Sequence, residues 1–387
     1  MFQLRCILAV MLFGNTRDVF AQITRIWLSH RTNYPSHIVI NWESSTPGHS
    51  EVYFYIEPDN NYRVIKEEDT TLHHVEIPLK YHDVQYHYHV KTGSEQSETY
   101  TFKSYPSSQH ELRIAFVGNW LASPNHDLSK LIEDAPHLLF SLGDNIRNLH
   151  QSCGVGVTDC IEPFLKLIDH YPNLFRSTPF MSVLGNHDKE IRPRGNRPPS
   201  ESVYDLNVTA YRKFIELPDD EWKWEFGIPD FHIYFVGLDL NHTSDFNTTW
   251  QSCHDFHKNS EQFNWYKTVM ETRSKGYTIT LNNEKNNNVR VLEQGLWQEL
   301  LEKGNAVITG FGHFAEYAEV NGCSYFNTSL TSAGTLRPDP HSKFIKQKES
   351  YILLRCTNKN PLSLEIKQLD GTIINTTIFN PVSNEFF

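Results

Sequence analysis

"HLLFSLGDN" (residues 137–145) and "PFMSVLGNHD" (residues 179–188) decide the fold of this chain. Each is a short apolar run that ends in a glycine followed by polar side chains. Apolar runs of this length without polar alternation are typical of strands buried on both faces, as in sheets covered by helices. "LRIAFVGN" (112–119) and "AVITGFGH" (306–313) repeat the pattern. We therefore expect an α/β domain.

Polar residues follow the strands of this predicted domain. Helical patterns at 128–135, 260–276 and 292–304 separate some of the strands. In open α/β sheets, ligands bind where the strands end, so side chains from different strand ends can meet there. One such end is weak evidence, but several in one chain predict a site. The candidate residues are Asn119, Asp144, Asn186, His187, Asn282, Asn283 and His313.

Residues 23–106 show only strand patterns. "HIVINW", "EVYFYIE" and "VQYHYHVKT" are short alternating runs separated by turn-like stretches. Trp42 stands where a sandwich core holds a large ring. The segment resembles a fibronectin type III-like sandwich, with Leu79 and Tyr86 at the positions of that family's tyrosine corner. A polar, proline-containing hinge then leads into the second domain, residues 110–387.

The first residues have the character of a secretory signal. Residues 1–21 contain a basic residue (Arg5), a short apolar core and a small residue before Gln22. The alternative interpretation is a buried first helix. We expect the signal, and with it a secreted or periplasmic protein. The sequence has no run of 18 or more apolar residues, so no membrane span is expected.

The net charge argues against nucleic-acid binding. The 387 residues carry a formal charge of −11, with acidic and basic residues mixed along the chain. Proteins that bind nucleic acid through its phosphates need a basic face. We therefore expect no nucleic-acid partner.

The cysteines suggest an oxidising compartment. Cys153 and Cys160 enclose a short loop suited to a disulfide bond. Cys323 and Cys356 lie in strand-like stretches and would pair if those strands are neighbours. Cys253 is then left as a buried thiol.

"GDN", "GNHD" and "GFGH", each closing an apolar strand in this order, resemble the motifs of the calcineurin-like metallophosphoesterases, and within them the purple acid phosphatases. The resemblance covers about residues 23–387. It implies an α+β multidomain fold, with an N-terminal β-sandwich followed by a four-layer α/β/β/α domain. In that family two metal ions at the strand ends, bridged by an aspartate, activate a hydroxide that attacks a phosphate ester.

The motif positions of the first metal site are mostly altered. This site would use positions 119, 144, 147 and 315, which hold Asn119, Asp144, Arg147 and Ala315. Only the bridging Asp144 is a strong ligand. Arg147 stands where the family has a tyrosine and brings a fixed positive charge. We expect it to form an ion pair with Asp144 in place of the metal.

The second metal site is better preserved. It would use Asp144, Asn186, Asn282 and His313, with Asn282 in place of a histidine. Imidazole and carboxylate hold zinc, iron or manganese, and a set rich in amides is poor for all three. The resemblance therefore implies at most one divalent or ferric ion. The motif Gly-Asn-His-Asp is complete at residues 185–188, which implies catalytic roles for His187 and Asp188.

Three functional hypotheses follow. The first is a catalytically impaired phosphoesterase homologue whose cleft binds a phosphate ester or another small anion. The anion would be bound by Asn145, Arg147, Arg192 and Arg194 together with His187.

The second hypothesis is an active phosphoesterase with one metal at Asp144, Asn186 and His313. His187 would be the general acid, oriented by Asp188. The coordination shell of the metal would be completed by Glu284, Glu316 or His126. The third is a non-catalytic adhesion module that binds a protein partner through the β-sandwich. An intact Gly-Asn-His-Asp motif favours the first two, because a purely structural loop does not need His187.

Overall fold

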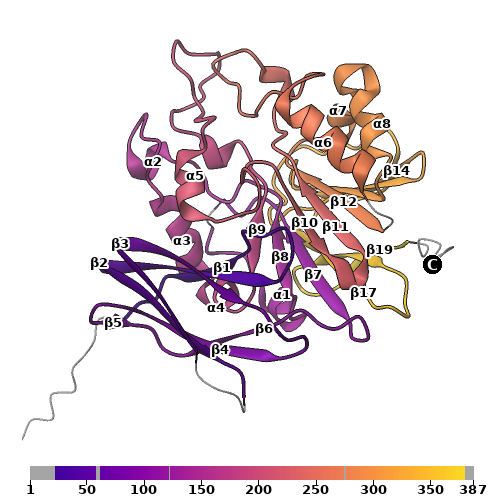
Figure 1. Ribbon diagram of the computed structural model, residues 1–387. Coiled ribbons are helices and arrows are strands. Elements are labelled where there is room, and N and C mark those ends of the chain that lie inside the picture. Colours follow the sequence, from indigo (N-terminus) through magenta and orange to yellow (C-terminus); the bar gives the residue numbers. More distant parts are fainter. Residues whose placement is uncertain (1–21, 58–61, 122, 274–275, 380–387) are drawn as a thin grey trace, which may run out of the picture.

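The computed structural model describes residues 22–57, 62–121, 123–273 and 276–379. The predicted signal segment, residues 1–21, lies outside this range. Figure 1 shows a β domain packed beside a larger domain of sheets and helices. No helix within the described ranges is long and apolar enough to cross a membrane.

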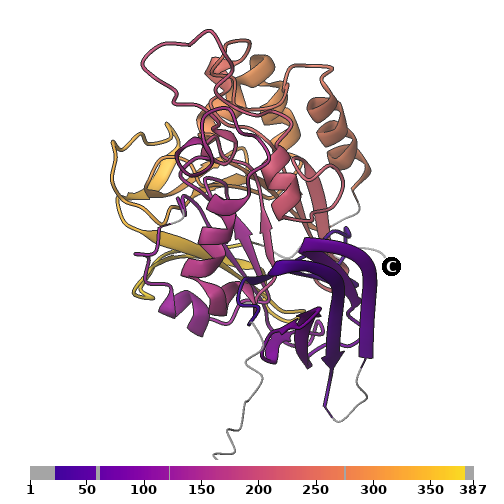
Figure 2. The same cartoon turned by 90° about the vertical axis from the view of Figure 1, so that its left-hand side faces the viewer.

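The N-terminal domain consists of antiparallel strands around one apolar core. Two of them, β2 and β3, are long and curved (Figure 2). Their register shifts near Gly48, so one half of β2 pairs with β1 and the other half with β4. Trp42 is fully buried in this core, as predicted. The strands are β1 (Ile26–Ser29), β2 (His37–Tyr55), β3 (Tyr62–Pro78), β4 (Gln85–Thr92), β5 (Glu95–Gln96) and β6 (Tyr100–Lys103).

One local feature of the predicted sandwich is present. The backbone N–H of Lys80 donates to the Tyr86 hydroxyl at 2.9 Å, which is the hydrogen bond of a tyrosine corner. Such a bond ties the strand that carries the tyrosine to the chain that precedes it. The assignment of the whole domain to the fibronectin type III class stays a prediction.

The second domain contains two sheets. In the first, β7, β8 and β9 run parallel; in the second, β11, β12, β13 and β15 do. The first sheet has the order β19 (Ile373–Ile378), β18 (Ser363–Gln368), β17 (Ser350–Cys356), β7 (Leu112–Val117), β8 (Leu138–Ser141) and β9 (Phe180–Ser182). The second has the order β10 (Trp224–Ile228), β11 (Ile233–Gly237), β12 (Tyr277–Asn282), β13 (Ala306–Thr309), β15 (Cys323–Asn327), β14 (Ala315–Val320) and β16 (Ser342–Lys346).

Helices flank both sheets and give four layers. One core lies between the two sheets, where Phe116, Phe140 and Phe235 contact each other, and it extends to the first group of helices. A second core packs the other sheet against α6 and α8 through Tyr266 and Trp297. The first group is α1 (Ser129–Glu133), α2 (His150–Cys153), α3 (Glu162–His170), α4 (Pro172–Phe175) and α5 (Thr209–Phe214). The second is α6 (Glu261–Thr272), α7 (Asn286–Val291) and α8 (Leu296–Leu301).

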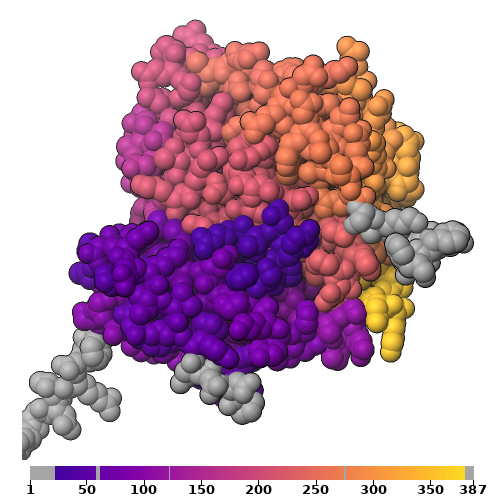
Figure 3. All heavy atoms as spheres, in the orientation of Figure 1, coloured from indigo at the N-terminus to yellow at the C-terminus, as the bar shows by residue number. Residues whose placement is uncertain are grey.

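The two domains are joined by buried aromatic contacts. Trp27 of the β domain stacks on Phe214 with 4.9 Å between ring centroids, and its indole N–H donates to the Phe214 carbonyl. The Tyr88 hydroxyl donates to the carbonyl of Arg176. In the space-filling view the domains meet along a continuous boundary (Figure 3). The β domain therefore forms part of the support for the sheets that carry the site.

The cysteines follow the sequence prediction in part. Cys153 and Cys160 form a disulfide bond, which confirms the prediction. Cys253 is a buried free thiol, as expected. The suggested pairing of Cys323 with Cys356 is wrong, because β15 and β17 belong to different sheets and both thiols are free.

Candidate functional site

The candidate site lies where β8 and β9 of the first sheet end. Asp144 follows β8, and Gly185 begins the loop after β9. A Cβ atom added to Gly185 would lie 2.1 Å from the Asp144 Oδ1 atom, so only a glycine allows the two loops to approach this closely. Asp144 itself has a positive φ of 56° and is mostly buried.

Asp188 joins these two loops. Its buried carboxylate accepts the backbone N–H groups of Asp144 (3.0 Å), Asn145 (2.8 Å), Ile146 (3.3 Å) and Gly185 (2.8 Å). It also accepts the side-chain amide of Asn145. Burial and the charge of Asp144 raise the pKa of Asp188 to about 7, although the N–H donors act in the opposite direction. Asp188 therefore connects the loop after β8 to the loop after β9.

His187 lies between Glu190 and the Arg147 backbone. Its Nδ1 atom is 2.7 Å from the Arg147 carbonyl oxygen and 3.4 Å from Glu190 Oε2. Burial would lower the pKa of His187, but the charges of Asp144 and Glu190 outweigh it and raise the pKa to about 9. The prediction that Asp188 orients this ring was wrong, because the partners of Nδ1 in the described residues are Glu190 and the Arg147 carbonyl.

Asn119 is held as a hydrogen-bond donor. Its side-chain amide donates to the Gly310 carbonyl and to the Ser329 hydroxyl, the latter at 2.9 Å. The surroundings are tight, since a Cβ added to the preceding Gly118 would lie 2.7 Å from the Gly310 Cα atom. A carboxylate has no N–H to donate and would face an oxygen at Gly310. The local structure therefore suits the amide at this position.

Asn282 and His313 approach from the second sheet. Asn282 is fully buried; its oxygen accepts the backbone N–H of Glu284, and its Nδ2 has no partner among the described residues. His313 Nδ1 contacts the Thr331 hydroxyl. Burial lowers the pKa of His313, and the charge of Asp144 acts in the opposite direction without outweighing it. The ring is therefore close enough to Asp144 to be affected by its charge.

Two further asparagines flank the centre. Asn186 precedes the short helix η1 (His187–Lys189) and is mostly buried. Asn145, predicted to contact an anion, already uses its amide: the oxygen accepts the Ser141 hydroxyl, and the nitrogen donates to Ser182 and Asp188. The side chain of Asn145 therefore helps Asp188 to hold the two loops together.

The sequence interpretation missed His242, which lies near the centre. It follows "LDLN" at the end of the loop after β11. Burial and the Arg194 charge lower the pKa of His242, whereas the carboxylates of Glu284 and Asp144 raise it, which places the ring within range of all three. Its ring packs edge-on against Phe311. A polar residue after β11, the neighbour of β12 in the second sheet, was the available signal.

The predicted anion-binding arginines are in different situations. Arg147 is exposed, and no ion pair joins it to Asp144 in the described part of the chain, so the predicted replacement of the metal by this pair was wrong. Arg192 pairs with Glu201. Arg194 pairs with Asp245, and its guanidinium lies 4.4 Å from the Trp250 ring centroid. Its charge is therefore already engaged within the protein.

The suggested extra metal ligands are engaged elsewhere. Glu284 accepts the backbone N–H groups of Thr243 and Lys285 and the Asn288 amide. Glu316 accepts the backbone N–H of Asp339 on the far side of β14. The third suggested ligand, His126, contacts the Trp120 carbonyl.

The donor set does not fit the metal centre that the resemblance implies. Across the described ranges, no three or more His, Cys, Asp and Glu side chains are grouped so as to hold a metal ion. The amide of Asn119 is used as a donor, and the Nδ2 atom of Asn282 has no hydrogen-bond partner in the part of the chain that the structure describes. An N–H donor attracts an anion or a water oxygen, and repels a cation. Ala315 offers no ligand and is fully buried.

Comparison with solved structures identifies the fold. The purple acid phosphatase PPD1 from yellow lupin (Lupinus luteus) seeds aligns over 92% of this chain and 74% of its own, with a TM-score of 0.70 at 14% identity. PhoD aligns over 93% of this chain and 94% of its own, with a TM-score of 0.64 at 12% identity. The chain has the fold of the purple acid phosphatase-like metallophosphoesterases. No family model and no curated protein matches the sequence.

Proposed function

We propose that this chain is a secreted protein on the metallophosphoesterase fold that lacks two-metal catalysis and binds a phosphate ester or another small anion in its cleft. The observation that carries the proposal is Asn119. It stands where the family's motif has a metal-binding aspartate, and its amide donates to Gly310 and Ser329 instead. The position that the resemblance assigns to the first metal thus holds an amide whose N–H groups are bound within the protein, in place of a carboxylate.

The remaining groups favour an anion. Arg147 is exposed and has no ion pair within the described residues, and its carbonyl contacts the neighbouring His187. Asn282 carries an N–H group that has no partner there, but the group is closed to solvent and so is not available to a ligand in the cleft. A fixed positive charge at the strand ends suits a phosphate group, which offers acceptor oxygens.

An active phosphoesterase with a single metal is the alternative. It is supported by the complete motif at residues 185–188 and by the position of His313 within range of Asp144. Against it stand Glu284, Glu316 and His126, whose polar groups already have partners in the protein. The proposed secretion is supported by the Cys153–Cys160 disulfide. The third hypothesis, a protein partner bound by the β-sandwich, is tested separately by pull-down with the full chain.

Two measurements on the full chain test the proposal. The protein is loaded with zinc, iron or manganese, desalted and analysed by mass spectrometry, and hydrolysis of an aryl phosphate is followed in parallel. We expect less than one retained metal ion per chain and hydrolysis at background. Retention of one or two ions with turnover that is lost on Asp144→Asn would establish a metalloenzyme instead.

Anion binding is measured separately by calorimetry with inorganic phosphate. We expect Arg147→Gln to weaken binding by about 10-fold, the loss typical of one charge-assisted contact. Arg197→Gln is the matched control, because Arg197 is also exposed and forms no ion pair within the described residues. Equal effects of the two variants would show that the phosphate responds only to net charge.

A further inference from the structure

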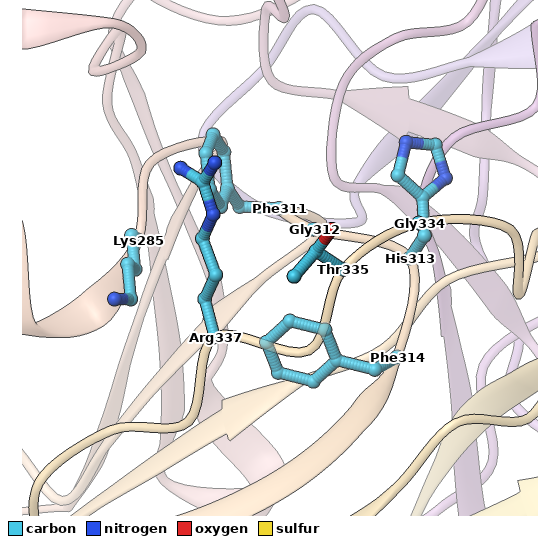
Figure 4. A pocket seen from close by; sticks show the side chains of 8 residues that line it. All are labelled: Lys285, Phe311, Gly312, His313, Phe314, Gly334, Thr335 and Arg337. Carbon is cyan, nitrogen blue, oxygen red and sulfur yellow. The ribbon is translucent and has the colours of Figure 1, made fainter.

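A second pocket lies on the other side of the loop that carries His313. It has a volume of about 190 Å³, room for roughly six water molecules at ~30 Å³ each, which suits a small ligand. Figure 4 shows the cationic side chains of Lys285 and Arg337 at one end, the Phe314 ring at the base and the His313 ring turned away. The pocket is lined by Lys285, Phe311, Gly312, His313, Phe314, Gly334, Thr335 and Arg337.

The loop at residues 311–314 contributes to both this pocket and the candidate site. Gly312 and His313 both have positive φ values, 94° and 61°, so the chain curls sharply here. A Cβ on Gly312 would lie 2.8 Å from the Phe314 ring, so the glycine allows that ring to close the wall of the pocket. His313 contacts Thr331 and senses the Asp144 charge. Phe311 and Phe314 thus line the pocket, while the imidazole belongs to the candidate site.

Neither cation of the pocket forms an ion pair. Lys285 and Arg337 have no carboxylate within ion-pair distance among the described residues, although the Lys285 charge acts to lower the pKa of Glu316. The carboxylates nearest in sequence are already engaged. Asp339 accepts two hydrogen bonds from Arg290 at 2.8 Å and one from the His341 backbone N–H, and Glu284 accepts backbone N–H groups. Arg337 is exposed and Lys285 is half-buried, so both charges are available to an anion that enters the pocket.

We propose that this pocket binds a small aromatic anion, an arene that carries a phosphate or carboxylate group. Lys285 and Arg337 bind the anionic oxygens, and the Thr335 hydroxyl can add a hydrogen bond. The rings of Phe311 and Phe314 pack against the arene, which is favourable because aromatic pairs gain more than their buried area alone. The site shares only the loop at residues 311–314 with the candidate centre. It therefore does not depend on whether that centre binds a metal or an anion.

Calorimetry with phenyl phosphate tests the pocket. The double variant Lys285→Gln/Arg337→Gln is compared with Lys267→Gln/Lys359→Gln, which makes the same charge change at exposed lysines without ion pairs in the described residues. At about 0.1 M salt we expect the pocket variant to weaken phenyl phosphate binding by about 10-fold or more. The control variant should change it less than about 2-fold. Equal losses in both variants would overturn the proposal.

Two further arms separate the pocket from the candidate site and from a simple phosphate effect. Phenyl phosphate is itself a phosphate ester that the candidate site binds, so the pocket is measured in the Arg147→Gln background. There the loss caused by the pocket variant should persist, because Arg147 does not line the pocket. Binding that is lost with Arg147→Gln but not with the pocket variant places the ligand in the candidate site and refutes the proposal. Inorganic phosphate should bind the pocket more weakly than phenyl phosphate. Equal affinities that both depend on Lys285 and Arg337 would exclude a role for the phenyl rings.

Discussion

Asn119 donates a hydrogen bond to the Ser329 hydroxyl at 2.9 Å, across the ends of strands from two different sheets. The same amide also donates to the Gly310 carbonyl. A single side chain thus ties the loop after β7 to the loops after β13 and β15. Two protein hydrogen bonds therefore join the strand ends at this position.

The first prediction concerns this connection. Asn119→Asp should destabilise the protein by about 1–3 kcal/mol, because both donors are lost and a carboxylate oxygen faces the Gly310 carbonyl. Urea unfolding of wild type and variant measures the difference. Asn125→Asp, at an exposed asparagine later in the same loop, is the matched control and should change stability by less than about 0.5 kcal/mol. A variant as stable as wild type would mean that the amide contacts contribute nothing.

Sequence patterns predicted the layered domain for a clear physical reason. A strand buried on both faces needs an apolar residue at every position, and this leaves a continuous run that is easy to recognise. The residues after such runs come together because parallel strands end at one edge, as Asp144 and His187 do. The predicted helix at 292–304 was less accurate: α8 begins only at Leu296, since Glu293 and Gln294 have left-handed backbone conformations.

The finer features of the site depend on side-chain directions, which no strand pattern encodes. The sequence could not tell that Arg147 points to solvent or that Asp188 accepts N–H groups from two loops. His242 was missed because no motif marks the end of the loop after β11. The pairing of Cys323 with Cys356 failed because two apolar strands need not lie in the same sheet.

The second prediction concerns the disulfide bond. Replacing Cys153 and Cys160 by serine should lower the free energy of unfolding by about 2–3 kcal/mol, the chain-entropy effect of closing so short a loop. The single variant Cys160→Ser should lose nearly as much, because either change removes the bond. Urea unfolding gives the stability, and thiol titration of denatured, unreduced protein gives the redox state. Free thiols at both positions in wild type would contradict the prediction.

The third prediction is a loss of stability in acid. His30, His73 and His137 are buried, and burial lowers the pKa of each to about 4. Their unfolded pKa values are near 6.5, so between pH 6.5 and pH 4 the unfolded chain binds more protons than the folded one. The contribution of these three groups to stability is therefore full above pH 6.5 and falls as the pH drops toward 4, by up to about 4 kcal/mol per pH unit for the three together.

The comparison of wild type with His30→Gln isolates one of these groups. Glutamine can still meet the His37 carbonyl and the Tyr105 hydroxyl, which are the two partners of His30, but it does not titrate. The variant should lose stability less steeply between pH 6.5 and pH 4, by about 1.4 kcal/mol per pH unit. Parallel stability profiles for the two proteins would show that His30 is already protonated in the folded state.

The last prediction reverses the altered metal positions. Asn119→Asp, Arg147→Tyr, Asn282→His and Ala315→His together should give a protein that retains about two metal ions and hydrolyses an aryl phosphate, with wild type near background. Single reversals should do little, because a metal site forms only when most of its ligands are present. Mass spectrometry of desalted protein measures the metal content, and circular dichroism checks that each variant is folded.

Ala315 is the difficult position in this design. It is fully buried in the core between the sheets, so a histidine there must displace neighbouring side chains, which typically costs about 1–3 kcal/mol. The triple variant without Ala315→His is therefore the necessary companion, and we expect it to bind one ion at most. Metal bound by the fourfold variant should raise its melting temperature, since a ligand that binds only the folded state stabilises it. Wild-type protein that carries two tightly bound ions and turns over phosphate esters would refute the assignment of positions 119, 147, 282 and 315 as the altered ones.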